Sequence, residues 1–449
     1  MKKVLTALCL LLLCAGSALA SAPEEANIFG VTPEMCRAEY WLRAAGHPDR
    51  VLMTPEQIAA FSAQVKQTPN TGCTDVLSLP EVLSAAQLRS KLQSYSLPKK
   101  DRYIGSRKAD AAYWAALDAQ RNLQNVSELN EVRFGVVVRE AAVKDFPTDD
   151  PLYSDPNDLE FDMNMESVLK VWEPVAVLNS SADGTWFYVQ CGTCLGWVKS
   201  ADVALSSREQ LKSVYARNFL VVTGNRIVQD IDHNEPDAER LELTMGTRLP
   251  LAVPKPDSVA GVMTPYSWVV TLPVRGADGA LAEKTVRIPF NADASAGFLP
   301  YTQGNFIRQA FKMLGERYGW GGMWHARDCS AFAKDIYAAF GLELPRNSGQ
   351  QARIPSFHAD LSKMTPEQKE KLIMKQPAGA ILRMSGHITL YLGRANGRAY
   401  VINDLYSVYP QALNGTRATV DSVAILALDV RRKNGRTFLE ELLDLNVIK

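Results

Sequence analysis

The sequence predicts a multidomain protein in which a helical N-terminal segment and two small β-barrels precede an α+β domain. Three observations carry this prediction. The chain has 449 residues, which is more than one hydrophobic core usually organises. Apolar residues follow helical spacing before about residue 132 and alternate with polar residues from there to about residue 300. Beyond that point helical patterns return and are followed by further strands.

Residues 1–20 have the layout of a cleavable secretory signal. Lysines follow the initiator methionine, an apolar stretch runs from Val4 to Leu13, and small residues close the segment at Ala20. The stretch is short for a membrane span, so a retained anchor is the weaker interpretation. Cys14 lacks the small preceding residue of a lipoprotein signal. We expect an exported protein without stable membrane insertion, in the periplasm or, alternatively, secreted.

Residues 21–131 are expected to form a helical segment rich in loops. A threonine cap followed by proline starts two helical patterns, TPEMCRAEYWLRAAG at Thr32 and TPEQIAAFSAQV at Thr54. A third amphipathic pattern is AAYWAALDAQRNLQ. Polar stretches without periodicity separate these patterns, so this segment is expected to wrap or clamp other domains.

Two groups of short strands are expected at residues 132–210 and 211–300. In the first range, apolar and polar residues alternate in RFGVVVRE, SVLKVWEPVAVLN, GTWFYVQ and LGWVKSADVAL. In the second range, strand patterns occur in NFLVVTG, TRLPLAV, YSWVVTLPV and KTVRIPF. Short strands at such close spacing are typical of small barrels, and we expect one barrel in each range.

Residues 301–449 combine helices with strands. Helical patterns occur in GNFIRQAFKMLGERYGW and DCSAFAKDIYAAFG, and strand patterns follow in GAILRM, GHITLYLG and RAYVIND. TFLEELLDL is expected to close the chain as a helix. Helices followed by an antiparallel set of strands predict an α+β domain.

The net charge gives no indication of a polyanionic partner. Lysines and arginines number 49, as do aspartates and glutamates, so nucleic-acid binding is not expected.

The cysteines are more informative. Five cysteines lie beyond the predicted signal. An odd number in an oxidising compartment leaves one thiol over. We expect disulfides joining Cys36 to Cys73 and Cys191 to Cys194, which leaves Cys329.

Cys329 is the candidate nucleophile. It stands at the start of a predicted helix that Asp328 or a neighbour can cap. The helix dipole and unpaired amides favour a thiolate there, so the pKa of Cys329 is expected to fall. The same amides could bind the oxyanion of a tetrahedral intermediate. A buried structural cysteine is the commoner role in proteins at large, but Cys329 is unpaired and lies between polar residues.

A cysteine nucleophile needs an imidazole as general base and a polar group that orients it. Of the five histidines, only His387 opens a clean strand, GHITLYLG, in which alternate residues share a face. The next strand, RAYVIND, ends with Asn403 and Asp404, which fall on opposite faces. We choose Asn403 as the orienting residue and keep Asp404 as the alternative.

Three sequence blocks carry a family resemblance. They are LGERYGWGGMWHARDCSAF, LPRNSGQQA and GHITLYLG. In order and spacing they resemble the catalytic blocks of the NlpC family of papain-like cell-wall cysteine peptidases. The phrases GTRLPL and LPYTQGNFIRQAF resemble parts of a multidomain subgroup with two bacterial SH3-like domains. CRAEYW and PDRVLMTPEQIAAF resemble that subgroup's N-terminal stabilising clip.

The resemblance implies a peptidoglycan hydrolase that needs no cofactor or metal. The implied reaction is endopeptidase cleavage of the γ-D-glutamyl-meso-diaminopimelate bond through a cysteine thiolate and an acyl-enzyme. The implied substrates are peptidoglycan stem peptides or murein fragments. Cys191-Gly-Thr-Cys194 could be a zinc half-site, but no second pair completes a metal set.

The resemblance also implies roles for individual residues. Asp328 and Ser330 match the family triplet that binds the free amine of a terminal L-alanine, and Tyr318 would lie beside the oxyanion site. Family members commonly have a histidine where this chain has Asn403. An asparagine can accept the Nδ1 proton of the imidazole without carrying charge.

Two further residues flank the nucleophile helix. Trp320 precedes it and Arg346 follows it, and each either packs or lines the substrate groove. We include both among the substrate-binding candidates. The chain departs from relatives in the first barrel, where Cys194 and Leu195 occupy positions that often hold a tyrosine before Gly196 and Trp197.

Two alternatives to the peptidase hypothesis stay open. One is a catalytically weak wall-binding protein in which the SH3-like domains supply the function. The other keeps the fold but changes the reaction to that of an amidase or acyltransferase. The presence of cysteine, histidine and asparagine in order favours an active enzyme.

Overall fold

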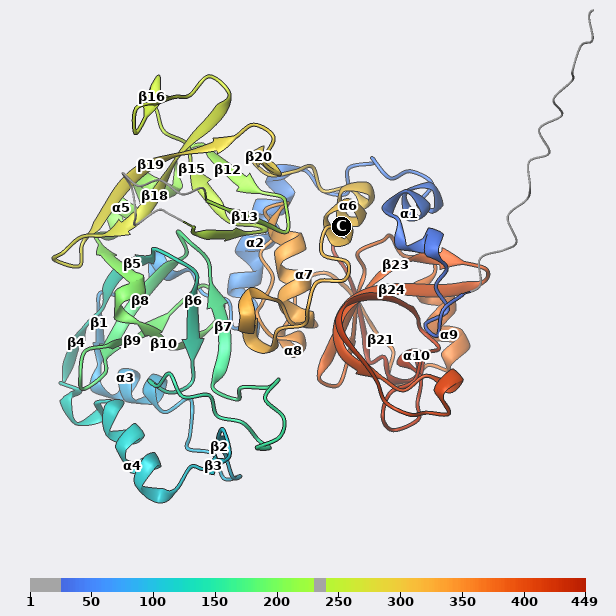
Figure 1. Cartoon of the computed structure of the whole chain (residues 1–449), viewed down its shortest axis with the longest axis horizontal. Coiled ribbons are helices and arrows are strands. Elements are labelled where there is room, and N and C mark those ends of the chain that lie inside the picture. Colours follow the sequence, from blue (N-terminus) through green and yellow to red (C-terminus); the bar gives the residue numbers. More distant parts are fainter. Residues whose placement is uncertain (1–25, 230–239) are drawn as a thin grey trace, which may run out of the picture.

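A computed structural model describes residues 26–229 and 240–449. The predicted signal at residues 1–20 and the histidine at position 233 lie outside the described residues. Helices and strands combine in a multidomain arrangement, which confirms the predicted fold class (Figure 1). Within the two described ranges no helix is long and apolar enough to cross a membrane.

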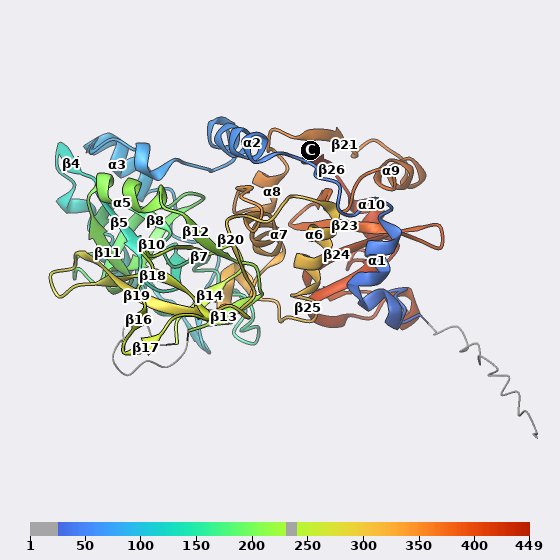
Figure 2. The same ribbon diagram turned by 90° about the horizontal axis from the view of Figure 1, so that it is seen from above.

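The N-terminal segment spreads its helices over the rest of the molecule. Its helices are η1 (Pro33–Cys36), α1 (Ala38–Ala44), α2 (Pro55–Gln67), η2 (Val76–Ser78), α3 (Ala85–Leu92), α4 (Ala111–Gln120) and η3 (Leu123–Asn125). Short strands pair as β1 (Val82–Ser84) with β4 (Leu129–Glu131), and β2 (Tyr103–Ile104) with β3 (Arg107–Lys108). In Figures 1 and 2, α1 lies on the C-terminal domain, α3 and α4 lie on the first group of strands, and α2 lies between them.

Local chemistry and packing explain how this segment is fixed. Thr54 caps α2, because its side chain accepts a hydrogen bond from the Gln57 amide while the Gln57 side chain accepts one from the Thr54 amide. Trp41 of α1 is 1% exposed and packs 5.4 Å from Tyr400, measured between ring centroids. The segment therefore contacts both halves of the molecule as a clamp would.

The first group of strands forms one seven-stranded antiparallel sheet. Its order is β11-β5-β8-β9-β10-β6-β7. The strands are β5 (Arg133–Val137), β6 (Ala141–Lys144), β7 (Met165–Leu169), β8 (Pro174–Ser180), β9 (Trp186–Gln190), β10 (Leu195–Lys199) and β11 (Val203–Ser206), with η4 (Ser200–Asp202) before the last. Alternate residues turn inward, and Tyr188 and Trp197 are completely buried in the core.

The second group of strands is divided among small sheets. After α5 (Arg208–Tyr215), β12 (Phe219–Val222) pairs with β15 (Arg248–Pro250) and β20 (Ala294–Ala296). Two-stranded sheets are β13 (Arg226–Val228) with β14 (Glu242–Thr244), β16 (Ser258–Val259) with β17 (Val262–Met263), and β18 (Ser267–Arg275) with β19 (Leu281–Pro289). The strands are thus less continuous than in the first group.

The C-terminal domain is built on a six-stranded antiparallel sheet of order β21-β26-β22-β23-β24-β25. Its strands are β21 (Phe357–Asp360), β22 (Ile381–Met384), β23 (His387–Ala395), β24 (Arg398–Val408), β25 (Ala418–Ala427) and β26 (Asp444–Val447). Its helices are α6 (Gln303–Phe311), η6 (Trp320–His325), α7 (Cys329–Ala338), α8 (Ser348–Gln351), α9 (Pro366–Ile373), η7 (Gln411–Leu413) and α10 (Phe438–Glu441).

The two faces of this sheet carry separate cores. Ile388, Leu390 and Leu392 pack with residues of α6 and α7. Tyr391, on the opposite face of the same strand, packs with residues of α9 and α10. The alternation expected from GHITLYLG is confirmed.

The expected helix over TFLEELLDL is wrong in its second half. Only Phe438–Glu441 is helical, and Asp444–Val447 forms β26 between β21 and β22. Helix propensity predicts a continuous helix over these residues, but the unfilled position inside the sheet provides ladder hydrogen bonds on both sides. Tertiary pairing therefore overrides local propensity.

Candidate active site

Asp328 determines where α7 begins. Its backbone is extended, and its Oδ1 accepts hydrogen bonds from the amides of Ser330 (3.1 Å) and Ala331 (2.9 Å). This is the capping pattern that aspartate provides at a helix N-terminus. Cys329 is the first residue of α7 and is 9% exposed. The expected place of Cys329 at a capped helix start is confirmed.

The same cap corrects one expectation about the oxyanion. We expected free amides of the first helical turn to bind the negative oxygen of a tetrahedral intermediate. In the structure the amides of Ser330 and Ala331 already donate to Asp328. An oxyanion at this helix end would therefore need other donors.

The pKa of Cys329 is also contrary to expectation. Burial and the neighbouring Asp328 carboxylate raise it to about 12, against the lowering effect of the Ile388 amide, which donates to the sulfur. Helix termini stabilise a charge by about 2 kcal/mol at most. The capping carboxylate offsets that field, and desolvation of a buried thiolate then dominates. At neutral pH Cys329 is a thiol.

His387 and Asn403 are in direct contact. The Nε2 atom of His387 lies 2.8 Å from the Oδ1 atom of Asn403. Asn403 is buried, and its Nδ2 donates to the Ala424 carbonyl at 3.2 Å, which fixes its amide so that Oδ1 faces the imidazole. His387 therefore carries its proton on Nε2 and leaves Nδ1 as an acceptor. A contact from Asn403 to Nδ1 of His387 was expected, and that expectation is wrong. Asn403 of β24 lies diagonally across from His387 of β23, and the imidazole turns its Nε2 toward it.

The imidazole of His387 is neutral at physiological pH. Burial lowers its pKa to about 4, and the nearby Arg432 charge adds to this, while the hydrogen bond with Asn403 opposes it. The ring lies perpendicular to Phe438, with centroids 5.9 Å apart. Cys329 meets the amide of the next residue, Ile388. No hydrogen bond joins the Cys329 sulfur to His387 in the described part of the chain.

Asp404 has a different environment from Asn403. It is completely buried, and neither carboxylate oxygen has a hydrogen-bond partner among the described residues. Burial and the charges of Asp328 and Glu316 raise its pKa well above the ordinary value. Asp404 is thus a carboxyl group whose ionisation is disfavoured, on the opposite face of β24, and Asn403 is the residue that touches the imidazole.

Replacing Asn403 by alanine is expected to lower kcat on a stem-peptide substrate by about 10- to 100-fold. This matches the loss of one buried hydrogen bond worth about 1–3 kcal/mol. Asp404→Asn is the matched control, because an amide replaces a neutral acid of the same shape and should change kcat little. Steady-state kinetics of the two variants check this. A larger loss in the Asp404 variant would reverse the assignment.

A buried ion pair connects α7 to the first sheet. The Nη2 of Arg346 lies 2.6 Å from Asp328 Oδ2, and its Nη1 lies 3.0 Å from Oδ1. The Nε of Arg346 donates to Ser167 of β7 at 2.9 Å, and Nη1 also reaches the Ser330 hydroxyl at 2.9 Å. The Gly321 amide donates to Asp328 as well. Arg346 is 3% exposed. Its charge lowers the pKa of Asp328 against the opposing effect of burial.

This network bears on three sequence-predicted residues. Asp328 was expected to bind a substrate amine, but its oxygens already accept hydrogen bonds from several protein donors. Ser330 donates to Asp328 at 2.9 Å. Arg346 directs its hydrogen bonds inward, to Ser167, Asp328 and Ser330, instead of lining an open groove. Ser167 was missed by the sequence, because its contact arises between domains and has no local pattern.

Tyr318 and Trp320 belong to an aromatic cluster. Phe161, from the first group of strands, lies 5.5 Å from Trp320 and 5.1 Å from Tyr406, measured between ring centroids. Tyr318 is 7% exposed, and burial raises its pKa, as does the nearby Asp328 carboxylate. Tyr318 pairs with Arg327, two residues before Cys329, and so lies near that residue. Phe161 and Tyr406 had no recognisable signal in the sequence.

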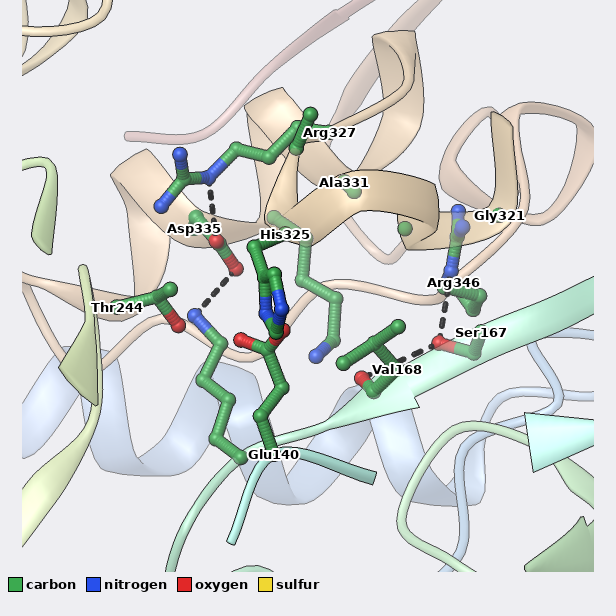
Figure 3. Close-up of a pocket in the computed structure, with 14 residues that line it drawn as sticks. Glu140, Ser167, Val168, Thr244, Gly321, His325, Arg327, Ala331, Asp335 and Arg346 are labelled. Carbon is green, nitrogen blue, oxygen red and sulfur yellow. Dashed lines mark hydrogen bonds and ion pairs between the residues drawn. The ribbon is translucent and has the colours of Figure 1, made fainter. Parts of the chain in front are cut away.

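Other described histidines have separate partners. His325 Nδ1 lies 2.6 Å from Glu140, and His358 Nε2 lies 2.9 Å from Asp444. Figure 3 shows His325 beside Glu140 at a small cavity, with Arg346 directed toward Ser167 and Arg327 toward Asp335. This cavity of about 40 Å³ lies between β7 and α7. Among residues 26–229 and 240–449, no group of three or more His, Cys, Asp or Glu side chains could hold a metal ion.

The expected disulfides are absent from the structure. Cys36, Cys73, Cys191 and Cys194 are all free thiols. The sulfurs of Cys191 and Cys194 are 2.7 Å apart, whereas a disulfide bond measures about 2.05 Å. The turn between β9 and β10 brings these two together, whereas Cys36 and Cys73 belong to separate parts of the N-terminal segment.

Comparisons with known proteins agree with this architecture. Residues 315–405 match the NlpC/P60 family, and residues 151–199 match the SH3 domain of SH3b1 type. An NlpC/P60 endopeptidase from Photobacterium damselae subsp. piscicida has a similar fold, with a TM-score of 0.73 and 19% identity over 91% of this chain and 96% of that one. An NlpC/P60 family protein from Bacillus cereus ATCC 10987 is 18% identical, with a TM-score of 0.47 over 70% of this chain and 99% of that chain. No curated protein matches the chain.

The fold and the domain matches define a multidomain protein with an SH3b-type domain before a papain-like domain. Within it, residues 315–405 form the part that matches the NlpC/P60 family. The class implied by this family is that of cysteine peptidases and peptidoglycan hydrolases.

Proposed function

We propose that the protein is a cysteine endopeptidase that cleaves the γ-D-glutamyl-meso-diaminopimelate bond of peptidoglycan stem peptides. The observation that carries this proposal is the 2.8 Å contact between His387 Nε2 and Asn403 Oδ1, beside a cysteine at the start of a capped helix. Cys329 is assigned as nucleophile, His387 as general base and Asn403 as the orienting residue. The bond specificity rests on the family resemblance of the motifs.

The reaction begins from a neutral pair. Substrate binding brings the thiol within hydrogen-bond reach of His387, since such contacts tighten in the enzyme–substrate complex. Nδ1 of His387 accepts the thiol proton while sulfur attacks the glutamyl carbonyl. The tetrahedral intermediate collapses, the carbon–nitrogen bond breaks, and the imidazolium gives its proton to the departing amine. Water then attacks the thioester, transfers a proton to Nδ1 and releases the glutamyl product, and the proton returns to sulfur.

Proton transfer from a thiol with a raised pKa has a physical advantage here. A thiolate and an imidazolium would both be charges in a buried site, and desolvation penalises each one. The hydrogen bond from His387 Nε2 to Asn403 Oδ1 is already formed while the imidazole is neutral. When the ring accepts a proton and becomes an imidazolium, the same hydrogen bond becomes charge-assisted. The interaction strengthens as charge develops, which is what lowers a reaction barrier.

The oxyanion requires donors other than the capped amides. We assign the backbone amide of Cys329 and the Tyr318 hydroxyl to this role, since Tyr318 pairs with Arg327, two residues before Cys329. Asp328, Ser330 and Arg346 form the hydrogen-bonded network at the start of α7. We assign them the role of holding that helix in position. Trp320, in edge contact with Phe161, is assigned to the groove wall.

The function is tested with the tripeptide L-Ala-γ-D-Glu-meso-diaminopimelate under reducing conditions. Mass spectrometry should detect L-Ala-D-Glu and free diaminopimelate. The control substrate carries the same residues with an α-linked glutamate and should stay intact. Binding to purified peptidoglycan without release from any stem peptide would instead support the wall-binding alternative. Cleavage between muramic acid and L-alanine would support the amidase.

The pH dependence follows from the neutral imidazole. Because burial lowers the pKa of His387 to about 4, the base stays unprotonated through the mildly acidic range. Activity is present above that pKa and is lost as pH falls through it. We expect kcat/KM to show its acidic limb near pH 4, which a pH–rate profile with circular dichroism at each pH would measure. An acidic limb near the ordinary histidine pKa of about 6.5 would contradict the neutral, buried base.

A further inference from the structure

Two adjoining cavities lie where the N-terminal segment, both groups of strands and α7 meet. The first has a volume of about 420 Å³ and the second, which runs along α2, about 740 Å³. Volumes of about 300–1,000 Å³ are typical of small-molecule sites. Figure 2 shows α2 crossing above this junction, with α7 on the same side as the C-terminal domain. Arg248 of β15 lines both cavities.

Arg248 is a cation without an anionic partner. Its guanidinium carbon lies 4.0 Å from the ring centroid of Phe219 and 5.4 Å from that of Phe298. Its Nε is buried and has no hydrogen-bond partner, and Arg248 makes no ion pair among the described residues. The acid whose field it feels, Glu343, is committed to Lys66 at 2.9 Å. Desolvating a charge without such compensation is costly.

A second cation reaches the first cavity from the nucleophile helix. Lys334 of α7 lines it and makes no hydrogen bond or ion pair within residues 26–229 and 240–449. Lys170, which lines the same cavity, is different, because its ammonium lies 2.6 Å from Asp335. Arg248 and Lys334 therefore make no hydrogen bond or ion pair with a described residue, although the charges of Glu173 and Asp335 raise the pKa of Lys334 against the effect of burial.

The rest of the first cavity's wall combines aromatic side chains with four carboxylates, those of Asp75, Glu173, Asp335 and Glu343. Trp172 directs its indole nitrogen to the Thr271 carbonyl at 2.8 Å, and the Tyr215 hydroxyl donates to the Trp172 carbonyl. Both rings line the first cavity, and their polar ends are already satisfied by the protein. Trp172 is 2% exposed and Tyr215 is partly exposed, so the ring surface that an occupant would meet belongs mainly to Tyr215. Cations without a direct partner beside an aromatic ring are suited to a molecule that has a carboxylate at one end and an apolar body.

We infer that this junction is a binding site for a small carboxylate with an apolar body, held through Arg248 and Lys334. The carboxylate would form the charge-assisted hydrogen bonds that the guanidinium lacks, and the apolar body would lie against Trp172 and Tyr215. This site is separate from the one at Cys329, since it lies along the later turns of α7. The same chemistry occurs in free organic acids and at the C-terminus of short peptides.

The test uses the full chain, the Arg248→Met variant and the Arg394→Met control, in which an exposed arginine outside both cavities is changed. Benzoylglycine and the dipeptide L-Ala-L-Phe are the two carboxylate probes, and their uncharged amides are the matched ligands. Thermal unfolding and calorimetric titration are measured for each pair. We expect at least one carboxylate to raise the Tm of the wild type and of Arg394→Met, and its amide to have little effect. Arg248→Met should abolish the shift.

A second measurement does not depend on the choice of probe. Without ligand, Arg248→Met should raise Tm by about 2–4 °C, because the change removes an uncompensated charge and keeps a flexible side chain between two rings. A lower Tm would show that Arg248 is structural and would overturn the inference. Failure of both carboxylates to shift the wild type, or equal shifts in Arg248→Met, would overturn it as well. A response to benzoylglycine alone identifies a free acid, and a stronger response to the dipeptide identifies a peptide.

Discussion

Cys329→Ala is expected to reduce kcat/KM on L-Ala-γ-D-Glu-meso-diaminopimelate by about 10⁴- to 10⁶-fold, the scale on which hydrolases lose activity without their nucleophile. In the proposed mechanism the sulfur forms the covalent bond to the glutamyl carbonyl, which an alanine side chain cannot do. Release of L-Ala-D-Glu, followed by mass spectrometry over long incubation, measures the residual rate.

Two controls make the Cys329 prediction specific. Cys73→Ala removes a free, half-buried thiol of the N-terminal segment and should leave kcat/KM within about twofold, since Cys73 lies outside the proposed catalytic set. Thermal unfolding of Cys329→Ala should stay near that of the wild type, because the substitution removes a single sulfur atom. Retention of substantial peptide cleavage by Cys329→Ala would remove Cys329 from the mechanism.

The neutral state of Cys329 predicts low reactivity of its thiol in the absence of substrate. Burial raises its pKa to about 12, so little thiolate exists at pH 7 before substrate binds. A low-pKa thiol reacts with any small electrophile, whereas a neutral buried thiol reacts once a base is positioned beside it. Selectivity would then come from substrate-dependent proton transfer to His387 rather than from a standing ion pair.

The sequence predicted the elements whose signals are local. Asp328 and Cys329 were placed at a helix start because an aspartate cap precedes an apolar pattern, and α7 begins there. His387 was placed on a strand because apolar residues alternate after it, and β23 begins at that residue. The two faces of one strand separated Asn403 from Asp404, and the family resemblance placed Asn403 where a histidine is common; the contact with the imidazole is made by Asn403.

What the sequence did not predict depends on contacts between distant segments. The protonation states of Cys329 and His387 follow from burial, which no local pattern reports. The strand at Asp444–Val447 depends on a vacant position in the sheet, and local propensity could not find it. Arg346 was taken for a groove residue because LPRNS says nothing about what the guanidinium meets. Its partners come from α7 and from β7, nearly two hundred positions away along the chain.

Arg346→Ala is expected to reduce the free energy of unfolding by about 3–5 kcal/mol, the usual cost of leaving one partner of a buried ion pair uncompensated. Arg346 and Asp328 are 3% and 7% exposed, and the pair is 2.6 Å apart. Denaturant unfolding followed by fluorescence measures the change. Arg43→Ala, which breaks an exposed pair with Glu34 at 2.8 Å, is the matched control and should cost about 1 kcal/mol or less.

A double variant separates charge from packing in the Asp328–Arg346 pair. Asp328→Asn keeps an oxygen that can cap α7 but removes the charge, so combining it with Arg346→Met should recover part of the stability that either change loses alone. Full additivity of the two losses would mean that the ion pair does not couple these residues. Recovery of stability without recovery of kcat/KM would show what the pair does for catalysis: it holds the start of α7, and with it Cys329, against the first sheet.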